Sequence, residues 1–312
     1  MKKFLSLTLC LVLALTVLLC AVGCTKTGGK EGAYTREGDY VYIGEYPQTV
    51  KASDVTITST TDDRGYYLGS DGSYYAKVTA TPCEEGYKFS NGEAVVAGQE
   101  YFFKVEPIRW RILKEADGNA TLLCDSIIAS ISYQSDYTHG TNFNYYTTAN
   151  GAPEGTFANN YKYSNARAWL NSTFLNDAFS AFQRESVILT SEVDNSLAST
   201  GEVKNGYVCE NTSDKVFFLS LSEVNDSKNG LGSSASNYDE SRKMMTSDYS
   251  RATGAWMDTT DTYYGNGSWW LRSPDSLYGD MVRLLHFGNA ENLSRAANTN
   301  AGAVPAMKIT LD

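Results

Sequence analysis

The chain has 312 residues, of which 42% are hydrophobic and 20% charged, enough apolar material for one large core or two modest ones. Its 36 acidic residues outnumber its 26 lysines and arginines, so the formal net charge is −10. An acidic surface repels nucleic acid, so no nucleic-acid partner is expected.

The first residues are typical of an export signal. Two lysines within residues 1–3 precede an apolar run over 4–19 that is short for a membrane span. The run leads into Ala-Val-Gly-Cys over 21–24, which resembles the cleavage motif of a bacterial lipoprotein. We predict a signal peptide over 1–23 and a lipid on Cys24 that holds the protein at the outer face of the cell membrane. The alternatives are an ordinary signal peptide and an uncleaved anchor.

Short strands and turns follow. Residues 39–50 alternate apolar and polar side chains, which predicts a half-buried strand that Pro47 ends. Asp71–Gly72 and Asn91–Gly92 are dipeptides typical of hairpin turns, because glycine adopts positive φ without strain. A third such turn, Asp117–Gly118, is expected to join two antiparallel strands.

Helical signals lie in the middle of the chain. Residues 164–179 place apolar side chains on one side of a helix, and Ser180 with Gln183 predicts a capping box that opens a second helix. Residues 214–224 indicate a buried strand that runs into a polar turn, and 240–256 are compatible with one more short helix. Strands return at the end. The order predicts an α+β fold of antiparallel sheets with two or three short helices.

The predicted domain organisation follows from these elements. A signal peptide over 1–23 is followed by a flexible spacer over 24–39 and by a single domain over 40–312. Within that domain we expect a β-rich part over about 40–105 and a core over about 106–312.

Three cysteines remain between the predicted lipid site and the end of the chain. An exported protein favours a disulfide, and Cys124 with Cys209 is the candidate pair, which leaves Cys83 as the spare. The two histidines, His139 and His286, are far apart in sequence, so a structural zinc site is not expected.

No cofactor is expected, and calcium is the one ion that the sequence leaves open. Residues 225–230 and 258–261 offer oxygen ligands. Neither segment makes a complete calcium loop, because Ser236 stands where the closing glutamate of the first would be.

Six motifs, in this order, resemble a family of bacterial surface proteins and lipoproteins of unassigned function. The resemblance covers residues 40–312. The motifs are IGEYPQT, FSNGE with YFFKVEPIRWRIL, NARAWLNSTFLNDAF, DKVFFLSLSEV, RATGAW with YYGNGSWWLRSP, and GAVPAMKITL.

The end of that family resembles the C-type-lectin-like fold, shared with formylglycine-generating enzymes and with retroelement-diversified surface proteins. The resemblance implies that a Trp-rich strand over 269–274 and a closing strand over 302–306 frame exposed, changeable loops over 276–300. Val304 stands where the family often has an arginine. Formylglycine-generating chemistry needs late cysteines, and none follows Cys209, so that activity is not implied.

Candidate binding residues lie in and after the Trp-rich strand. Neighbouring side chains on a strand point to opposite faces, so one of Trp269 and Trp270 is expected to pack while the other faces a groove. The alternatives are core roles for the tryptophans, a buried acid partner for Arg272, and a solvated loop without a ligand. The predicted ligand-binding residues are Trp270, Arg272, Tyr278, Asp280, Arg283, His286, Asn289, Asn292, Arg295 and Asn298.

These observations predict recognition of a glycan or protein ligand at the cell surface, without catalysis. One alternative is a cell-envelope enzyme that uses a pair of acids, and another is a retroelement-diversified display protein with a variable loop over 276–300. An enzyme should show convergent carboxylates or a histidine in its deepest pocket. A binding protein should show a shallow aromatic or polar face made by residues 276–300.

Overall fold

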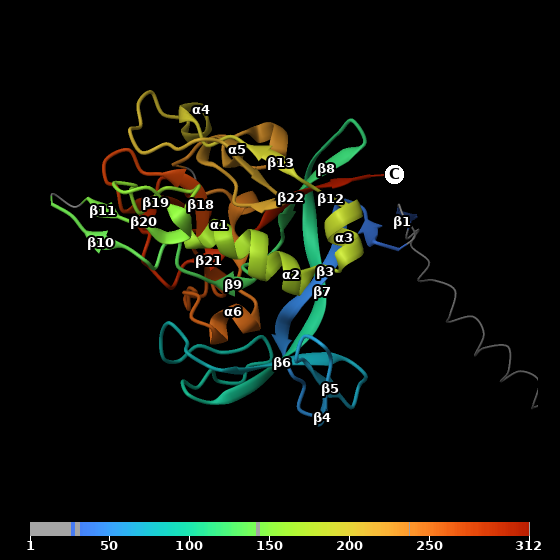
Figure 1. The fold of residues 1–312 in the computed structure, drawn as a ribbon. Helices are drawn as coiled ribbons and strands as arrows, with labels where there is room; N and C mark the ends of the chain where they lie inside the picture. Colours follow the sequence, from blue (N-terminus) through green and yellow to red (C-terminus); the bar gives the residue numbers. More distant parts are fainter. Residues whose placement is uncertain (1–25, 29–31, 142–143, 237, 312) are drawn as a thin grey trace, which may run out of the picture.

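A computed structural model describes residues 26–28, 32–141, 144–236 and 238–311, and eleven strands of these residues form one large antiparallel sheet (Figure 1). Its main path is β1-β2-β3-β7-β6-β5-β4, β8 lies between β7 and β22, and β12 and β15 pair with β22. The strands are β1 (Lys26–Gly28), β2 (Tyr34–Glu37), β3 (Tyr40–Val50), β4 (Ile57–Thr61), β5 (Tyr67–Gly69), β6 (Tyr74–Thr79), β7 (Glu100–Ala116), β8 (Asn119–Cys124), β12 (Ile188–Leu189), β15 (Val216–Phe217) and β22 (Ala306–Thr310).

The long strands β3 and β7 run through the centre of this sheet. Their register shifts between Tyr42 and Glu45 and again between Pro47 and Thr49. The prediction that Pro47 ends the strand is wrong, because β3 continues to Val50. Proline lacks a backbone donor, but an irregular pairing next to it removes the need for one.

The three predicted turns are confirmed. Asp71–Gly72 connects β5 to β6, Asp117–Gly118 connects β7 to β8, and Asn91–Gly92 closes a loop bridged by Lys88 and Ala94. The glycines of these turns have φ values of 79°, 73° and 86°, in the region that glycine adopts without strain.

A second sheet carries most of the predicted binding region. Its order is β20-β19-β18-β21-β9, and all neighbours are antiparallel except β18 and β21. Residues 276–300 are therefore not one exposed loop, because Val282 and Leu285 pack in the core and hold a strand there. The strands are β9 (Ala129–Ser130), β18 (Trp269–Pro274), β19 (Met281–Leu285), β20 (Leu293–Arg295) and β21 (Gly302–Ala303).

Three short pairs complete the strands of the described residues. Each pair forms a separate two-stranded sheet. They are β10 (Thr138–His139) with β11 (Tyr145–Tyr146), β13 (Ser191–Val193) with β14 (Thr212–Asp214), and β16 (Met244–Met245) with β17 (Asn266–Gly267).

The helices are short. The stretch predicted over 164–179 is confirmed as α1, the π-helical η2 and α2 in direct succession, and Ser180 with Gln183 forms the predicted capping box on α3. The described residues hold more helices than the two or three expected, because the predicted polar turn after 217 is instead the capped helix α5. The helices are α1 (Asn165–Trp169), η2 (Leu170–Phe174), α2 (Leu175–Ala178), α3 (Ala181–Ser186), α4 (Leu197–Thr200), α5 (Leu221–Val224) and α6 (Asp248–Ala252), with the 3-10 turns η1 (Ala149–Gly151), η3 (Ser227–Asn229) and η4 (Glu240–Arg242).

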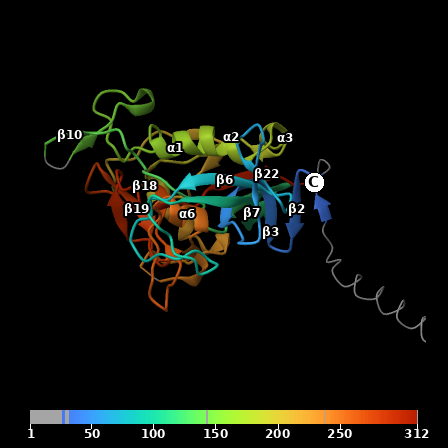
Figure 2. The same cartoon turned by 90° about the horizontal axis from the view of Figure 1, so that it is seen from below.

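Helices α1, α2 and α3 lie in a row along one face of the large sheet (Figure 2). The core lies between them and the sheet. Trp110 is fully buried there, and its indole N–H donates to the Ile43 carbonyl at 2.9 Å. Strand β3 approaches the end of α2 closely at Gly44, where a β-carbon would lie 2.6 Å from the Phe179 ring.

The predicted boundaries differ from the structure in two places. Strand β7 crosses residues 105–106, so the expected β-rich part and core share one sheet. The segment 24–39, expected to be a flexible spacer, contributes β1 and β2, because Tyr34 is buried and β2 pairs with β3. The predicted signal peptide and Cys24 lie outside the described residues.

The predicted disulfide is absent. Cys83, Cys124 and Cys209 are free thiols, and Cys124 is buried in the core at the end of β8. Burial raises the pKa of the Cys124 thiol to about 12, so it is held there as a small apolar side chain. Within the described ranges, no helix has the length and apolar character that a membrane crossing needs.

Candidate functional site

The Trp-rich strand β18 is interior. Trp269 and Trp270 are 1% and 0% exposed, so Trp270 does not face a groove as predicted. Their indole N–H groups donate to the carbonyls of Arg242 at 3.1 Å and Ile131 at 2.9 Å. Strand alternation does put them on opposite faces, but both faces of β18 are covered.

Arg272 is also buried, at 2% exposure, and cannot bind a ligand as predicted. Its guanidinium donates to both carboxylate oxygens of Glu223 at 2.6 and 3.0 Å and to the carbonyls of Phe218 and Asp194. Burial opposes ionisation of Glu223, but the charge of Arg272 and the hydrogen bonds from Arg272 and Ser220 together outweigh it, so the pKa of Glu223 is lowered. The pair ties α5 to β18, which is the structural alternative stated above.

Two predicted residues, Asp280 and Arg295, meet at a small cavity of about 80 Å³. We call this site the tyrosine box and define it by Tyr137, His139, Tyr145, Asp280 and Arg295. The three rings come from the β10–β11 hairpin and pack with centroids 4.5 to 5.5 Å apart. Asp280 directly precedes β19, and Arg295 ends the neighbouring strand β20.

The charges of the tyrosine box are arranged asymmetrically. The Asp280 side chain is 7% exposed, whereas the Arg295 side chain is 54% exposed. Arg295 Nη1 donates to Asp280 at 2.7 Å and to the Tyr145 hydroxyl at 3.0 Å, and the guanidinium lies 5.5 Å from the centre of the Tyr145 ring. Burial raises the pKa of Asp280, and Arg295 partly opposes that rise.

A second cluster lies at the turn that follows β19. We call it the aromatic face and define it by Trp256, Tyr263, His286 and Phe287, all partly exposed. The Phe287 ring stacks on Tyr263 at 4.3 Å and lies 4.0 Å from the His286 ring. Trp256 lies 5.2 Å from His286, whose Nδ1 is 2.7 Å from the Ser268 hydroxyl. Burial lowers the pKa of His286, so the imidazole is neutral near pH 7.

The other predicted residues mostly hold turns. Arg283 pairs with Glu202 at 2.8 Å and with Asp275 at 3.3 Å. The ring of Tyr278 is 45% exposed, but its backbone carbonyl accepts from Asn159. Asn292 and Asn298 donate to the Asn289 carbonyl and the Ser294 hydroxyl close by in the chain, and Asn289 donates to the carbonyl of Ser236 in a distant loop.

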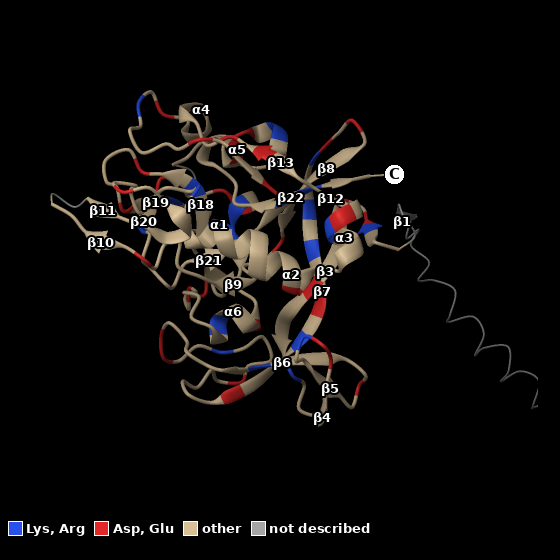
Figure 3. Cartoon of the chain, in the orientation of Figure 1, with Lys and Arg blue, Asp and Glu red and all other residues tan. Residues whose placement is uncertain are grey.

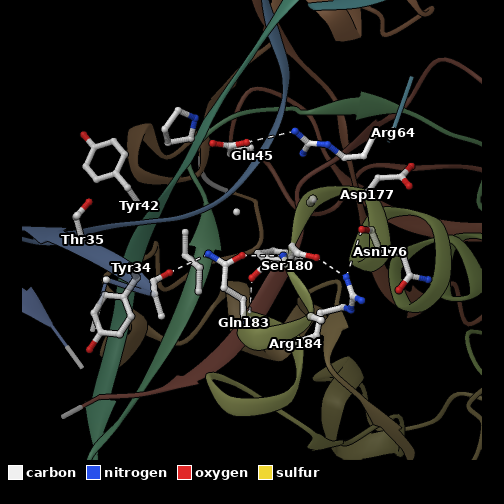
Figure 4. Close-up of a pocket in the computed structure, with 18 of the residues that line it drawn as sticks. Tyr34, Thr35, Tyr42, Glu45, Arg64, Asn176, Asp177, Ser180, Gln183 and Arg184 are labelled. Atoms are coloured by element: carbon white, nitrogen blue, oxygen red, sulfur yellow. Dashed lines mark hydrogen bonds and ion pairs between the residues drawn. The ribbon is translucent and has the colours of Figure 1, made fainter. Parts of the chain in front are cut away.

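A much larger cavity was not anticipated from the sequence. This large groove has a volume of about 1150 Å³ and lies between β2, β3, the loop at Arg64, and the corner where α2 meets α3 (Figure 4). Arg64 lies 3.6 Å from Glu45, and Gln183 donates to the Ala33 carbonyl at 2.8 Å while it accepts from the backbone N–H of Ser180. A cavity of about 450 Å³ continues past Arg64.

No metal or catalytic cluster emerges from the described part of the chain. It holds no group of three or more histidine, cysteine or acidic side chains placed to bind a metal ion. In both segments considered for calcium, an aspartate side chain accepts a hydrogen bond from the neighbouring backbone. Asp226 caps η3, and Asp258 accepts from the backbone N–H of Thr260. No described carboxylate hydrogen-bonds to His286, so the Ser268–His286 pair has no third member of a triad.

Acidic and basic residues are scattered over the described ribbon (Figure 3). The chain belongs to the family described as Domain of unknown function (DUF6273), which it matches over residues 118–311. No curated protein and no solved structure matches the chain. The tyrosine box and the aromatic face lie wholly within the matched region, whereas β2, β3 and Arg64 of the large groove lie outside it.

Proposed function

We propose that this protein recognises a glycan through the tyrosine box, without catalysis. The observation that carries this proposal is the ion pair of buried Asp280 and exposed Arg295 at the mouth of the cavity. A carboxylate accepts hydrogen bonds and a guanidinium donates them, so the pair complements two neighbouring sugar hydroxyls. The rings of Tyr137 and Tyr145 offer an apolar surface to the C–H face of the same sugar.

The cavity of the tyrosine box is large enough to hold only the edge of a ligand. Its volume of about 80 Å³ is well below that of sites that enclose a small molecule, roughly 300 to 1,000 Å³. Arg295 engages only Nη1 with the described residues, so Nε and Nη2 are available to a ligand. A shallow site with open donors and exposed rings favours binding over chemistry, which needs an enclosed reacting group.

We also propose a C-type-lectin-like architecture for the C-terminal half. The resemblance requires the Trp-rich strand and the closing strand, which frame residues 276–300, to lie side by side. In support, Trp269 of β18 pairs in parallel with Gly302 of β21. The order of motifs around these strands is the further support for this assignment.

Export and lipid anchoring complete the proposal. The apolar run that precedes Cys24 supports lipid attachment there. Cells grown with a labelled fatty acid should label the wild-type protein and not the Cys24→Ser variant. Equal labelling of both would refute the anchor.

A glycan array with full-length protein in detergent tests the proposed function. Positive sugars are then compared with their deoxy analogues, each lacking one hydroxyl of a neighbouring pair. We expect binding to need such a pair and to be weakened in Asp280→Asn and Arg295→Gln. Asp226→Asn and Arg64→Gln, which change exposed charges elsewhere, should bind like wild type. Binding only to protein ligands, or unchanged binding by both box variants, would refute the proposal.

A further inference from the structure

The aromatic face contains a strained residue. The turn after β19 has only Phe287 and Gly288 between the bridged residues His286 and Asn289. Phe287 has a φ of 52° and Gly288 a φ of 80°. Such turns favour Asn-Gly or Gly-Gly, because both central residues need positive φ. A bulky aromatic residue in this region is an outlier that points to a function.

The turn cannot relax by moving toward the rest of the protein. A β-carbon on Gly288 would lie 2.1 Å from the Asp239 carbonyl oxygen, so the glycine is pressed against that backbone. Phe287 is thereby presented next to its partners. Its ring is nearly parallel to Tyr263, at 14°, and Lys243 Nζ lies 4.4 Å from the centre of the Tyr263 ring. The Ser268 hydroxyl fixes the neighbouring His286 ring.

The result is a cluster of four partly exposed rings, of which Tyr263 and Phe287 are nearly parallel. Aromatic rings at a protein surface accept the apolar face of a sugar ring. The face and the tyrosine box lie at opposite ends of the same strand, because Asp280 precedes β19 and His286 follows it. Six residues of extended chain place them about 20 Å apart.

We propose that the aromatic face is a second sugar-binding subsite and that the protein binds a glycan chain rather than a single sugar. This inference rests on the proposed function of the tyrosine box. A chain long enough to reach both subsites gains affinity by effective concentration, whereas a shorter one occupies a single subsite.

The test uses full-length protein in detergent and four probe series, namely gluco-, manno-, galacto- and chito-oligosaccharides of one to eight units. In at least one series we expect the affinity to rise roughly a hundredfold once the chain spans both subsites. Phe287→Asn should remove that rise and leave monosaccharide binding unchanged. Phe182→Asn, which replaces an exposed phenylalanine on α3, is the matched control and should behave like wild type.

A thermal melt separates a binding role from a structural one. Asparagine adopts positive φ readily, as Asn150 does in this chain at 53°, so Phe287→Asn should not lower Tm if the ring is there for a ligand. A clear fall in the Tm of Phe287→Asn would overturn the inference. So would an affinity that still rises with chain length in Phe287→Asn, or the absence of such a rise in all four series with the wild-type protein.

The outcomes also separate the two proposals. Monosaccharide binding that Asp280→Asn weakens, without any gain from chain length, would refute the second subsite and keep the tyrosine box. Long-chain binding that depends on Phe287 and not on Asp280 would refute the box and keep the aromatic face as a sugar site. No binding in any series would refute both.

Discussion

The large groove has a volume of about 1150 Å³ and the tyrosine box about 80 Å³. The two sites also differ in the hydrogen bonds that their side chains already make. In the groove, Gln183 is bound at both ends of its amide and Arg184 donates to a carbonyl at the end of α2. In the box, Arg295 is 54% exposed and uses one of its three nitrogens. This contrast is the reason for which we propose the tyrosine box, rather than the large groove, as the binding site.

Among the variants that test this contrast, we expect Gly44→Ala in the large groove to have the largest effect. The φ of Gly44 is 72°, and a β-carbon there would lie 2.6 Å from Phe179 and 2.8 Å from the Ala178 carbonyl. We expect Gly44→Ala to lower the free energy of unfolding by about 3 kcal/mol, from backbone strain and overpacking together. Urea denaturation measures this loss, and glycan binding by the folded fraction should be unchanged.

Gly38→Ala is the control for that prediction. Gly38 has a φ of 59° but nothing within 4 Å of its would-be β-carbon. The variant should therefore show only the strain of a positive φ, about 1 kcal/mol. Equal losses in the two variants would mean that the contact of Gly44 with Phe179 does not matter, and lost binding in Gly44→Ala would point to a ligand in the groove.

A substitution in the tyrosine box should change ligand affinity rather than the free energy of unfolding. Asp280→Asn keeps the shape but removes the charge that orients Arg295, so we expect binding to weaken by about 2 kcal/mol. Gln183→Ala in the large groove should leave affinity unchanged. Calorimetric titration of wild type and both variants measures the difference, and a weaker affinity in Gln183→Ala alone would reverse the assignment of the site.

The pH dependence of binding should follow Asp280. Burial raises the pKa of this carboxyl above its usual value of 3.8 in spite of Arg295. As pH falls through that raised pKa, protonation removes an acceptor and binding should weaken. Folding should respond with the opposite sign, because a group with a raised native pKa stabilises the fold as pH falls. Affinity measured from pH 7 downwards, with circular dichroism as the control for folding, checks both signs.

Local signals predicted the turns and helix starts well, since Asp117–Gly118 and the Ser180 capping box depend on neighbours in the chain. Of the five residues of the tyrosine box, the sequence predicted only Asp280 and Arg295, because Tyr137 and Tyr145 lie more than a hundred residues before them. The period of two in β18 separated the two tryptophans correctly. It could not indicate that both faces of the strand are covered, since that depends on elements distant in sequence.

The smallest predicted effect concerns the strained turn of the aromatic face. Phe287→Asn relieves a left-handed backbone that costs a bulky residue about 1 to 2 kcal/mol and gives up ring stacking of similar size. The free energy of unfolding should therefore stay within about 1 kcal/mol of wild type. Tyr263→Ala removes the stacking partner without relieving the strain, so it should be less stable than Phe287→Asn. Urea denaturation of both variants measures this order. The reverse order would mean that Phe287 holds the turn together and is not kept in a strained conformation for a ligand.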